Sequence, residues 1–458
     1  VYKRQIGYLA IALEHPLKID KTASALLLGM VLWVIYALSC DSIVPQVAGA
    51  KFQAYLADNS SLAGKSLHEQ ALQYVLNVDI VEHLGDICQT LLFLIGAMTI
   101  VELIDVHGGF RVITDKITTR RKRHLLWILA FTTFFMSAIL DNLTTTIVML
   151  MLLRKLLQTK TERWMYAACI VIAANSGGAW SPIGDITTIM LWVNGNVTAG
   201  ALIEYTLLPS LVSMILPVWI VSKRLHGELR PISITVKEDL GFTTRERNTM
   251  FYLGVGGLIF VPVFKSITHL PPFVGILFVL GVLWVFTEIF YNTKMLEKAK
   301  EHRIPKVIAR VDMPSILFFL GILMAVAVLQ STGILSWMAG ALDEHVHNIY
   351  ITDTLLGVMS SIVDNVPLVA AAMGMYPVAD PGAVGYAADF VVNGTFWELL
   401  SYCAGVGGSI LIIGSAAGVI AMGIEKISFG WYLRNFSALA FLGFIAGVGV
   451  YMLEKWIF

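Results

Sequence analysis

Charge is scarce in this chain. Only 14% of its 458 residues are Asp, Glu, Lys or Arg, and 32 basic residues balance 32 acidic ones to a formal net charge of zero. Without a basic excess, nucleic acid is not a favoured partner. Apolar residues are correspondingly frequent: 57% of the chain is hydrophobic, and the mean hydropathy is +0.74. A soluble domain of this length could not bury so much apolar surface, so the composition predicts an integral membrane protein.

Cysteine is also scarce, with four residues at Cys40, Cys88, Cys169 and Cys403. They form no CxxC pair and have no metal-ligand spacing, which disfavours a disulfide scaffold and a cysteine metal site. We interpret them as small packing residues. No signal peptide is visible, and the apolar stretch 6–13 is too short to span a bilayer, so we expect it to be a fragment of a longer first helix.

Apolar runs long enough for membrane helices recur along the whole chain. The predicted segments are 5–14 (partial), 23–41, 87–106, 125–153, 164–193, 205–222, 249–264, 272–291, 313–330, 350–376, 396–423 and 430–453. Residues 42–86 are mixed in polarity and predict a surface excursion with amphipathic pieces. The fold class expected from this pattern is an all-α polytopic membrane protein.

The distribution of basic residues predicts which segments turn back inside the membrane. Basic residues lie on both sides of 125–153, which places both ends of that segment in the cytoplasm and predicts a re-entrant hairpin. The loops 331–349 and 377–395 contain no Lys or Arg, so 350–376 is predicted to be a hairpin that enters from the opposite side. Hairpins of opposite orientation indicate two inverted-topology repeats.

Internal similarity supports the repeats. The stretch from Ser137 to Asn142 recurs from Ser360 to Asn365, and the order of upstream Leu/Phe runs and downstream glycine pairs is the same in both copies. The expected organisation is residues 1–86 (partial helix, second span and extracytoplasmic excursion), 87–222 (repeat one, hairpin 125–153, broken helix 164–193), 223–311 (basic cytoplasmic loops and two linking spans) and 312–458 (repeat two, hairpin 350–376, broken helix 396–423).

The predicted hairpin tips carry the pairs Asp141-Asn142 and Asp364-Asn365 in apolar surroundings. A carboxylate at membrane depth costs about 2.5–3.5 kcal/mol on insertion scales, so it is normally kept only where it meets water, a cation or a proton. Asn carbonyls and the hydroxyls of the threonines beyond the first tip would complete the oxygen shell that hard cations prefer. The alternative is that both Asp residues only cap short helices.

The second constellation is Asn175-Ser-Gly-Gly-Ala-Trp-Ser-Pro-Ile-Gly-Asp185-Ile-Thr-Thr188, where paired glycines and Pro182 predict a broken helix. The alternative here is a flexible kink without a ligand. The second copy has Ser415 in place of Asp185, which predicts an asymmetric site. The predicted cation- and proton-binding residues are Asp141, Asn142, Thr144, Thr145, Asn175, Ser176, Gly177, Gly178, Asp185, Thr187, Thr188, Asp364, Asn365, Gly407, Gly408, Ser409 and Ser415. Those predicted to ligate sodium are Asp141, Asn142, Asn175, Asp364 and Asn365.

A third group is Glu102, Asp105 and His107, together with His83 at the start of the same span. Glu102 and Asp105 are three residues apart and share a helix face. Histidine titrates near neutral pH, so the group could relay protons or sense pH. An interfacial helix cap explains the acidic pair equally well, and for His83 we favour a structural role.

At these motifs the chain resembles the NhaD-type sodium/proton antiporters of the ion transporter superfamily, which also holds arsenite- and citrate-type permeases. The resemblance is carried by 96–105, 141–146, 175–188 and 270–273, and the third is the most specific. It implies a secondary transporter, not an enzyme, that exchanges Na⁺ or Li⁺ for H⁺ by elevator-like alternating access. It further implies a multi-pass protein of the bacterial cytoplasmic membrane in contact with lipid, with no cofactor and with peripheral helices that often serve for homodimerisation.

Three classes of function are open to this chain: cation antiport, transport of an anion or metalloid, and a membrane protein that transports nothing. Dicarboxylate carriers of the superfamily place Ser-Asn-Thr at their hairpin tips, whereas both tips here carry Asp, which would repel an anion. Arsenite carriers usually show Gly-Asp-Pro-Pro, whereas this chain has Gly184-Asp-Ile-Thr187. Cation antiport fits best, with sodium and protons competing for Asp141 and Asp185, and with Asp364 as a further candidate, since a carboxyl group removed from water holds a proton more readily.

Overall fold

The computed structural model describes residues 21–114, 119, 121–157, 159–228, 243–294, 303–362 and 364–457. All regular secondary structure within these ranges is helical, apart from one isolated bridge between Arg121 and Glu228. The all-α prediction is therefore confirmed. The expected partial helix 5–14 lies outside the described residues, as does much of the two basic loops.

Several helices are long and apolar enough to cross a membrane, which identifies a multi-pass membrane protein. In the described part of the chain these are Leu67–Val106, Lys122–Leu140, Ala199–Arg224, Thr244–Thr268, Pro272–Ile289, Met313–Ser331 and Phe429–Ile457. An eighth span results if the pair Thr22–Leu38 and Cys40–Val47, bent by 87°, counts as one.

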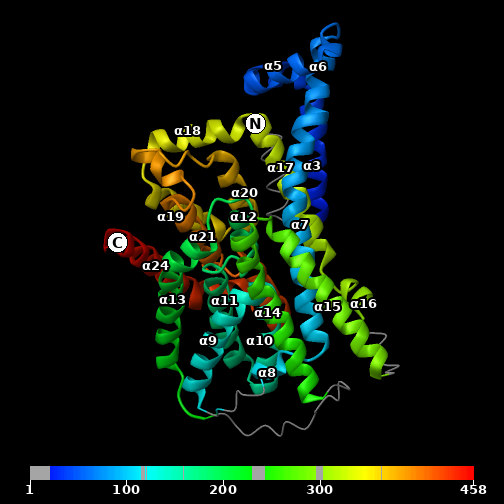
Figure 1. Cartoon of the computed structure of the whole chain (residues 1–458). Helices are drawn as coiled ribbons and strands as arrows, with labels where there is room; N and C mark the ends of the chain where they lie inside the picture. The colour runs from blue at the N-terminus through cyan, green and yellow to red at the C-terminus, as the bar shows by residue number, and fades with distance from the viewer. Residues whose placement is uncertain are drawn as a thin grey trace. The chain divides into compact units, whose positions relative to one another are not determined.

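The chain divides into two compact units, and the first contains residues 1–91, 312–348 and 369–377. Its main contact lies between α3 (Lys21–Leu38) and α17 (Met313–Ser331), which run side by side (Figure 1). Glycines permit this approach, because a Cβ on Gly29 would lie 2.6 Å from the carbonyl oxygen of Gly321. The ring Nε1 of Trp33 also donates to the Met324 carbonyl at 3.0 Å. Another helix of this unit is α18 (Ile334–Val346).

The stretch expected to be a surface excursion is largely helical. Its elements are α4 (Cys40–Val47), α5 (Gly49–Asp58), η1 (Ser60–Leu62), α6 (Leu67–Tyr74), η2 (Val75–Asp79) and α7 (Ile80–Val106). The expected span 87–106 is the end of a 40-residue helical run from Leu67. Hydropathy missed its first half because polar residues such as Asp79 interrupt the apolar run, whereas the structure buries Asp79 against the hydroxyl of Tyr36 at 2.6 Å.

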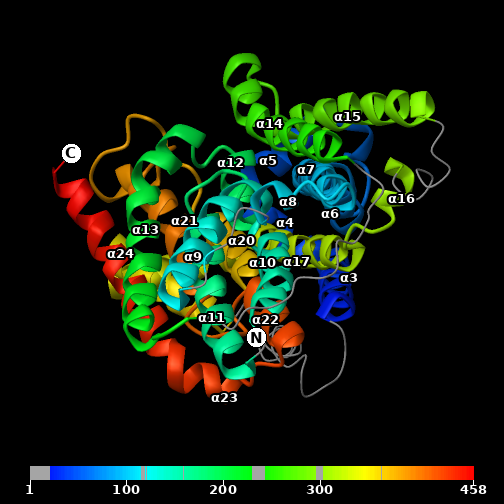
Figure 2. The same ribbon diagram turned by 90° about the horizontal axis from the view of Figure 1, so that it is seen from below.

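The second unit contains residues 92–311, 349–368 and 378–458. Its elements after α7 are α8 (Arg111–Thr114), α9 (Lys122–Leu140), α10 (Asn142–Leu156), α11 (Lys160–Gly178), α12 (Ile186–Val193), α13 (Ala199–Arg224), α14 (Thr244–Thr268), α15 (Pro272–Lys294), α16 (Ile304–Ile308), α19 (Ile349–Ser360), the start of α20 (Asn365–Met375), η4 (Gly385–Phe390), α21 (Thr395–Gly407), α22 (Ala416–Glu425), α23 (Phe429–Tyr432), η5 (Leu433–Ser437) and α24 (Ala438–Ile457). The closest packing joins α9 to α11, α19 to α21, and α13 to α24. Figures 1 and 2 both show α13 beside α24.

Matching glycines allow two of these helix pairs to pack closely. A Cβ on Gly177 of α11 would overlap the backbone carbonyl of Phe134 on α9, and a Cβ on Gly407 of α21 would overlap that of Gly357 on α19. Small residues at such crossings let backbones approach within a membrane protein. The two predicted broken helices are therefore each held against the first arm of a predicted hairpin.

Candidate functional site

The first break in the helices is at Asp141, between α9 and α10. This residue has φ 78° and ψ 159°, a conformation that non-glycine residues seldom adopt and that costs on the order of 1–3 kcal/mol. Its carboxylate accepts hydrogen bonds from the backbone N–H of Thr144 at 2.7 Å and from the Thr144 hydroxyl at 2.9 Å. Asp141 thus caps α10, as the alternative interpretation expected.

The second break separates α11, which ends at Gly178, from α12, which begins at Ile186. Asp185 caps α12, because its Oδ1 accepts from the backbone N–H and the hydroxyl of Thr187, both at 3.0 Å. Its own N–H donates to the hydroxyl of Thr188 at 3.3 Å. The Asp185 residue is 2% exposed, so this carboxylate is buried in the interior of the second unit.

Two asparagines approach the carboxylate of Asp185. The amide of Asn142 donates to Asp185 Oδ2 at 2.7 Å, and the amide of Asn365 donates to both carboxylate oxygens at 3.3 Å. Each asparagine directly follows a predicted hairpin-tip aspartate. Hydrogen bonds to an ionised acceptor are stronger than those between neutral groups, so both asparagines would be held most firmly by the ionised form of Asp185.

Asn175 on α11 extends this network to the other broken helix. Its Oδ1 accepts from the Asn142 amide at 3.1 Å, while its Nδ2 donates to the hydroxyls of Ser409 at 2.9 Å and Ser415 at 2.8 Å. We call Asn142, Asn175, Asp185, Asn365, Ser409 and Ser415 the central cluster, and all six are buried.

The helix caps of the two broken helices match in geometry but differ in charge. Asp185 has φ −146° and ψ 151°, and Ser415, which caps α22, has φ −145° and ψ 154°. The Ser415 hydroxyl accepts from the Gly418 N–H at 3.2 Å. Serine and aspartate cap helices about equally well. Capping therefore does not require a carboxylate at position 185.

Negative charge is concentrated around the central cluster. Asp185 interacts electrostatically with both Asp141 and Asp364, and like charges disfavour simultaneous ionisation unless a cation or proton intervenes. The hydroxyls of Thr145 and Thr146 on α10 are buried and have no hydrogen-bond partner among the described residues. They are oxygen atoms available to a hard cation.

Within the described ranges, no three Asp, Glu, His or Cys side chains converge as a metal site would require. A sodium ion in this region would consequently depend on amide, hydroxyl and backbone oxygens as well as on carboxylates. Asp364, next to the start of α20, is half-buried.

The remaining predicted site residues have packing roles in the structure. The Ser176 hydroxyl bonds to Ser213 of α13 at 2.9 Å. A Cβ on Gly178 would lie 2.6 Å from the Gly184 carbonyl, and one on Gly408 would lie 2.9 Å from the Gly414 carbonyl. These glycines let each broken helix fold closely on itself.

The predicted relay residues have other partners. Glu102 forms an ion pair with Arg310 at 3.9 Å, Asp105 is exposed, and the His107 ring contacts the Leu103 carbonyl at 2.7 Å. His83 belongs to the first unit, where its ring bonds to the hydroxyl of Ser331 at 3.0 Å. None of these contacts leads to the central cluster, and the structural interpretation of His83 fits its partner.

Sequence reasoning assigned no role to Ser137 and Ser360, although both open the repeated motif. The Ser137 hydroxyl donates to the Ala174 carbonyl at 2.6 Å, and the Ser360 hydroxyl donates to the Ala404 carbonyl at 2.8 Å. Each bond joins the end of one helix, α9 or α19, to the broken helix packed against it, just before that helix breaks. The recurrence of the serine in both copies was the signal that could have indicated this role.

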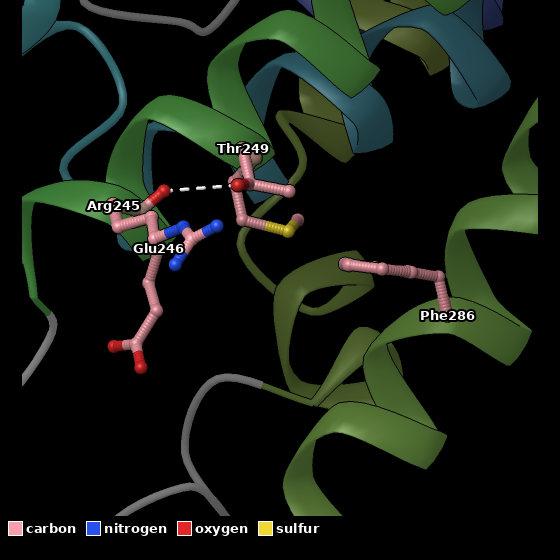
Figure 3. A pocket seen from close by; sticks show the side chains of 5 residues that line it. Arg245, Glu246, Thr249 and Phe286 are labelled. Carbon is pink, nitrogen blue, oxygen red and sulfur yellow. Dashed lines mark hydrogen bonds between the residues drawn. The ribbon is translucent and has the colours of Figure 1, made fainter.

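A separate cavity of about 190 Å³ lies between α14 and α15, lined by Arg245, Glu246, Thr249, Met250 and Phe286. Figure 3 shows the Thr249 hydroxyl donating to the Arg245 carbonyl, at 2.9 Å, on its α14 side. None of these residues is a predicted site residue, so this cavity is distinct from the central cluster.

Comparison with known proteins identifies the family. A family model described as "Citrate transporter" matches residues 8–392. The chain belongs to this family. It is therefore a member of a transporter family, not of an enzyme family, as the sequence predicted.

Relatives of this citrate transporter family member bear more specific names. "Sodium/proton antiporter 1" of Arabidopsis thaliana is 40% identical over 451 residues, which is 98% of this chain and 70% of the relative. "Sodium/proton antiporter 2" of the same plant is 39% identical over 450 residues, covering 98% and 97%. "Na(+)/H(+) antiporter NhaD" of Alkalimonas amylolytica is 29% identical over 481 residues, covering 98% and 88%. The resemblance to NhaD-type proteins is thus confirmed.

Proposed function

We propose that the protein is a secondary active transporter that exchanges Na⁺ or Li⁺ for H⁺ across a membrane. The observation that carries the proposal is the buried carboxylate of Asp185, which receives amide hydrogen bonds from the asparagines that follow both tip aspartates. The names of the relatives give independent support, since proteins up to 40% identical are called sodium/proton antiporters.

The proposed mechanism is competition at Asp185 and Asp141. With the carboxylate ionised, Asn142 and Asn365 turn their amide N–H groups toward Asp185. An asparagine side chain has a carbonyl oxygen as well as an NH₂ group, so rotation of the amide would present an oxygen to an arriving cation. A proton on the carboxyl group removes the charge that attracts the cation, so the two ions occupy the site in turn.

We also infer the finer fold, with two inverted repeats that each contain a re-entrant hairpin. Matched contacts support it: the bond from Ser137 to Ala174 on one side corresponds to the bond from Ser360 to Ala404 on the other. The alternating access implied by the resemblance, a homodimeric assembly and the lipid environment are part of the same proposal. Bacterial NhaD relatives support a bacterial cytoplasmic membrane, whereas the more identical relatives are plant proteins.

The alternative is transport of an anion such as citrate, the molecule named in the description of the family model. The site argues against it, because an anion would meet the negative charge of Asp185 and its neighbours Asp141 and Asp364. Adding citrate or sodium separately to vesicles and recording internal pH distinguishes the two. A proton signal with citrate and none with sodium would establish the alternative.

The test of the proposal is sodium-driven proton movement in everted vesicles or proteoliposomes. Asp185→Asn and Asp185→Ser both keep a good N-cap for α12 while removing the charge, so we expect folded protein and loss of exchange. Asp141→Asn is expected to abolish exchange as well. The matched control is Asp380→Asn, at an exposed position of the same unit, which should leave exchange unchanged. Full exchange in an Asp185 variant would remove that residue from the mechanism.

A further inference from the structure

A second group of buried acids lies at the junction of α19, α21 and α24, three helices that pack on one another in the second unit. Asp353 on α19 has no exposed surface, and neither oxygen of its carboxyl group has a hydrogen-bond partner among the described residues. The hydroxyl of the adjacent Thr352 is buried and equally without a partner in these ranges. Such an arrangement is rare for an acidic side chain and points to a ligand that the protein itself does not supply.

Glu398 on α21 is the second acid of the junction. Its Oε2 accepts from the hydroxyl of Tyr451 at 2.9 Å and pairs with the ammonium of Lys455 at 2.8 Å, both on α24. Its other oxygen is buried and has no hydrogen-bond partner in the part of the chain that the structure describes. Tyr451 interacts electrostatically with Glu398 and with Asp353, and the helices that carry these three residues pack on one another.

The surroundings supply little positive charge. The titratable groups that face the junction are Tyr350 from α19, Tyr402 and Cys403 from α21, Tyr451, Lys455 and Glu454 from α24, Glu204 and Tyr205 from α13, and Asp389 from η4. Lys455 lies 3.6 Å from the centre of the Tyr205 ring and is already paired with Glu398. The ammonium therefore balances one carboxylate and not two.

Burying an ionised carboxylate without a partner costs several kcal/mol even after the protein relaxes. A group in that position is retained either because it binds a proton, which removes the charge, or because it binds a cation. In a membrane protein, an ionisable residue kept under these conditions marks a functional site. At Asp353 the proton is the better ligand, because it removes the charge by binding one oxygen, whereas a metal ion needs several converging ligands and no three Asp, Glu, His or Cys side chains converge within the described ranges.

The first half of the chain shows that packing does not require these acids. Ala130 precedes Ser137 by the same seven residues that separate Asp353 from Ser360, and Ala168 precedes Ala174 by the same six that separate Glu398 from Ala404. Both alanines are buried in the matching helix pair, α9 and α11. Packing in the first half is thus achieved with methyl groups where the second half has two carboxyl groups.

We propose that Asp353 and Glu398 form a second proton-binding site, separate from the central cluster, at the junction of α19, α21 and α24. The step of seven positions from Asp353 to Ser360 corresponds to about 10 Å along the helix, which separates this site from the predicted tip. The exchangeable proton is on Asp353, with Glu398 held charged by Lys455. During transport this site moves additional protons, an assignment that rests on the proposed exchange of sodium for protons.

Infrared difference spectroscopy of the purified protein tests the site without transport. Between acidic and alkaline buffer, we expect the wild type to lose the carbonyl band of a protonated carboxylic acid, and Asp353→Asn to lack that component. Asp353→Ala, which reproduces the residue at position 130, gives the same readout should the first variant fold poorly. The control is Asp380→Asn, an exposed acid whose loss should leave the component intact. A component that persists in both Asp353 variants, or that does not respond to pH, overturns the proposal.

A second experiment measures how many protons move per sodium ion in proteoliposomes. We expect Asp353→Asn to exchange with a lower proton-to-sodium ratio, whereas Asp185→Asn loses exchange altogether. An unchanged ratio in Asp353→Asn excludes a part for this site in transport. Failure of the wild type to exchange sodium for protons contradicts the proposed function, and the infrared result then still decides whether Asp353 binds an exchangeable proton. Sodium-dependent loss of the carbonyl band at constant pH would assign the junction to a cation and overturn the proton assignment.

Discussion

Asn175 donates hydrogen bonds from one broken helix to the other, and its replacement by alanine tests the central cluster most directly. The change removes three hydrogen bonds, one accepted from Asn142 and two donated to Ser409 and Ser415, at 2.8–3.1 Å. It leaves the amide of Asn142 bonded to Asp185. The variant therefore removes hydrogen bonds between the two broken helices and leaves the carboxylate of Asp185 unchanged.

The size of the effect follows from the number of bonds. Hydrogen bonds between helices in a membrane protein are worth about 0.6 kcal/mol each on average and at most about 1.7. Losing three should lower the free energy of unfolding by about 2 kcal/mol, a fraction of the roughly 5–15 kcal/mol of a folded protein. The protein should fold, but Asn142 then keeps its bond to Asp185 and loses the one to Asn175, so its orientation is less well fixed. About 1.4 kcal/mol of lost binding energy corresponds to a tenfold weaker affinity.

The assay is the sodium concentration that gives half-maximal proton movement in proteoliposomes, together with denaturant unfolding of the purified protein. For Asn175→Ala we expect about a tenfold higher half-maximal sodium concentration. The matched control is Asn194→Ala, at the exposed end of α12, which loses one amide bond to Asn196 and should behave as wild type. Wild-type sodium dependence in Asn175→Ala, with the expected loss of stability, would refute the idea that this residue organises the site.

Two further predictions concern packing and charge elsewhere in the second unit. Gly177→Ala should abolish folded protein or exchange, because its Cβ would overlap the backbone of Phe134. The control Gly200→Ala has no atom within 4 Å of its Cβ and should be neutral or stabilising by up to about 1 kcal/mol. Expression and thermal unfolding measure both effects, and a well-folded, active Gly177→Ala would contradict the close helix crossing. Glu425→Gln should lower the free energy of unfolding by about 1–3 kcal/mol, because this buried carboxylate pairs with Arg154 at 2.7 Å and with Arg163 at 2.8 Å and glutamine keeps the shape without the charge. A denaturant titration that shows no change would exclude a stabilising role for the pairs.

Helix positions and helix breaks were largely predictable from the sequence. The break at Asp141 and the interruption between Gly178 and Ile186 fall where an Asp-Asn pair and a glycine–proline stretch interrupt apolar runs. The start of the long helix at Leu67 was not predictable from hydropathy, because polar residues such as Asp79 find partners only in the folded protein. The all-α membrane class followed from composition alone.

The candidate site was only partly predictable. Sequence reasoning indicated that Asn175 and Asp185 would contribute to one site, but the bonds of Asn175 to Ser409 and Ser415 join residues more than two hundred positions apart and depend on the fold. The sequence gives no signal for Asp353, which lies in an apolar segment away from the helix breaks. Burial without a partner is a property that only the structure reveals.

The two halves of the chain separate what the fold requires from what the chemistry requires. Asp185 and Ser415 adopt nearly the same backbone angles, and each caps a short helix. The hydroxyl of Ser415 is enough for capping, so the carboxylate of Asp185 is not needed for that purpose. At the second acidic group the carboxylate is in the second half instead, because Asp353 there corresponds to the buried Ala130 in the first half. Each half thus contains a buried carboxylate at a position where its counterpart needs none. If the two halves share one architecture, these departures from symmetry mark where charge serves transport instead of packing, and they place that charge in both halves.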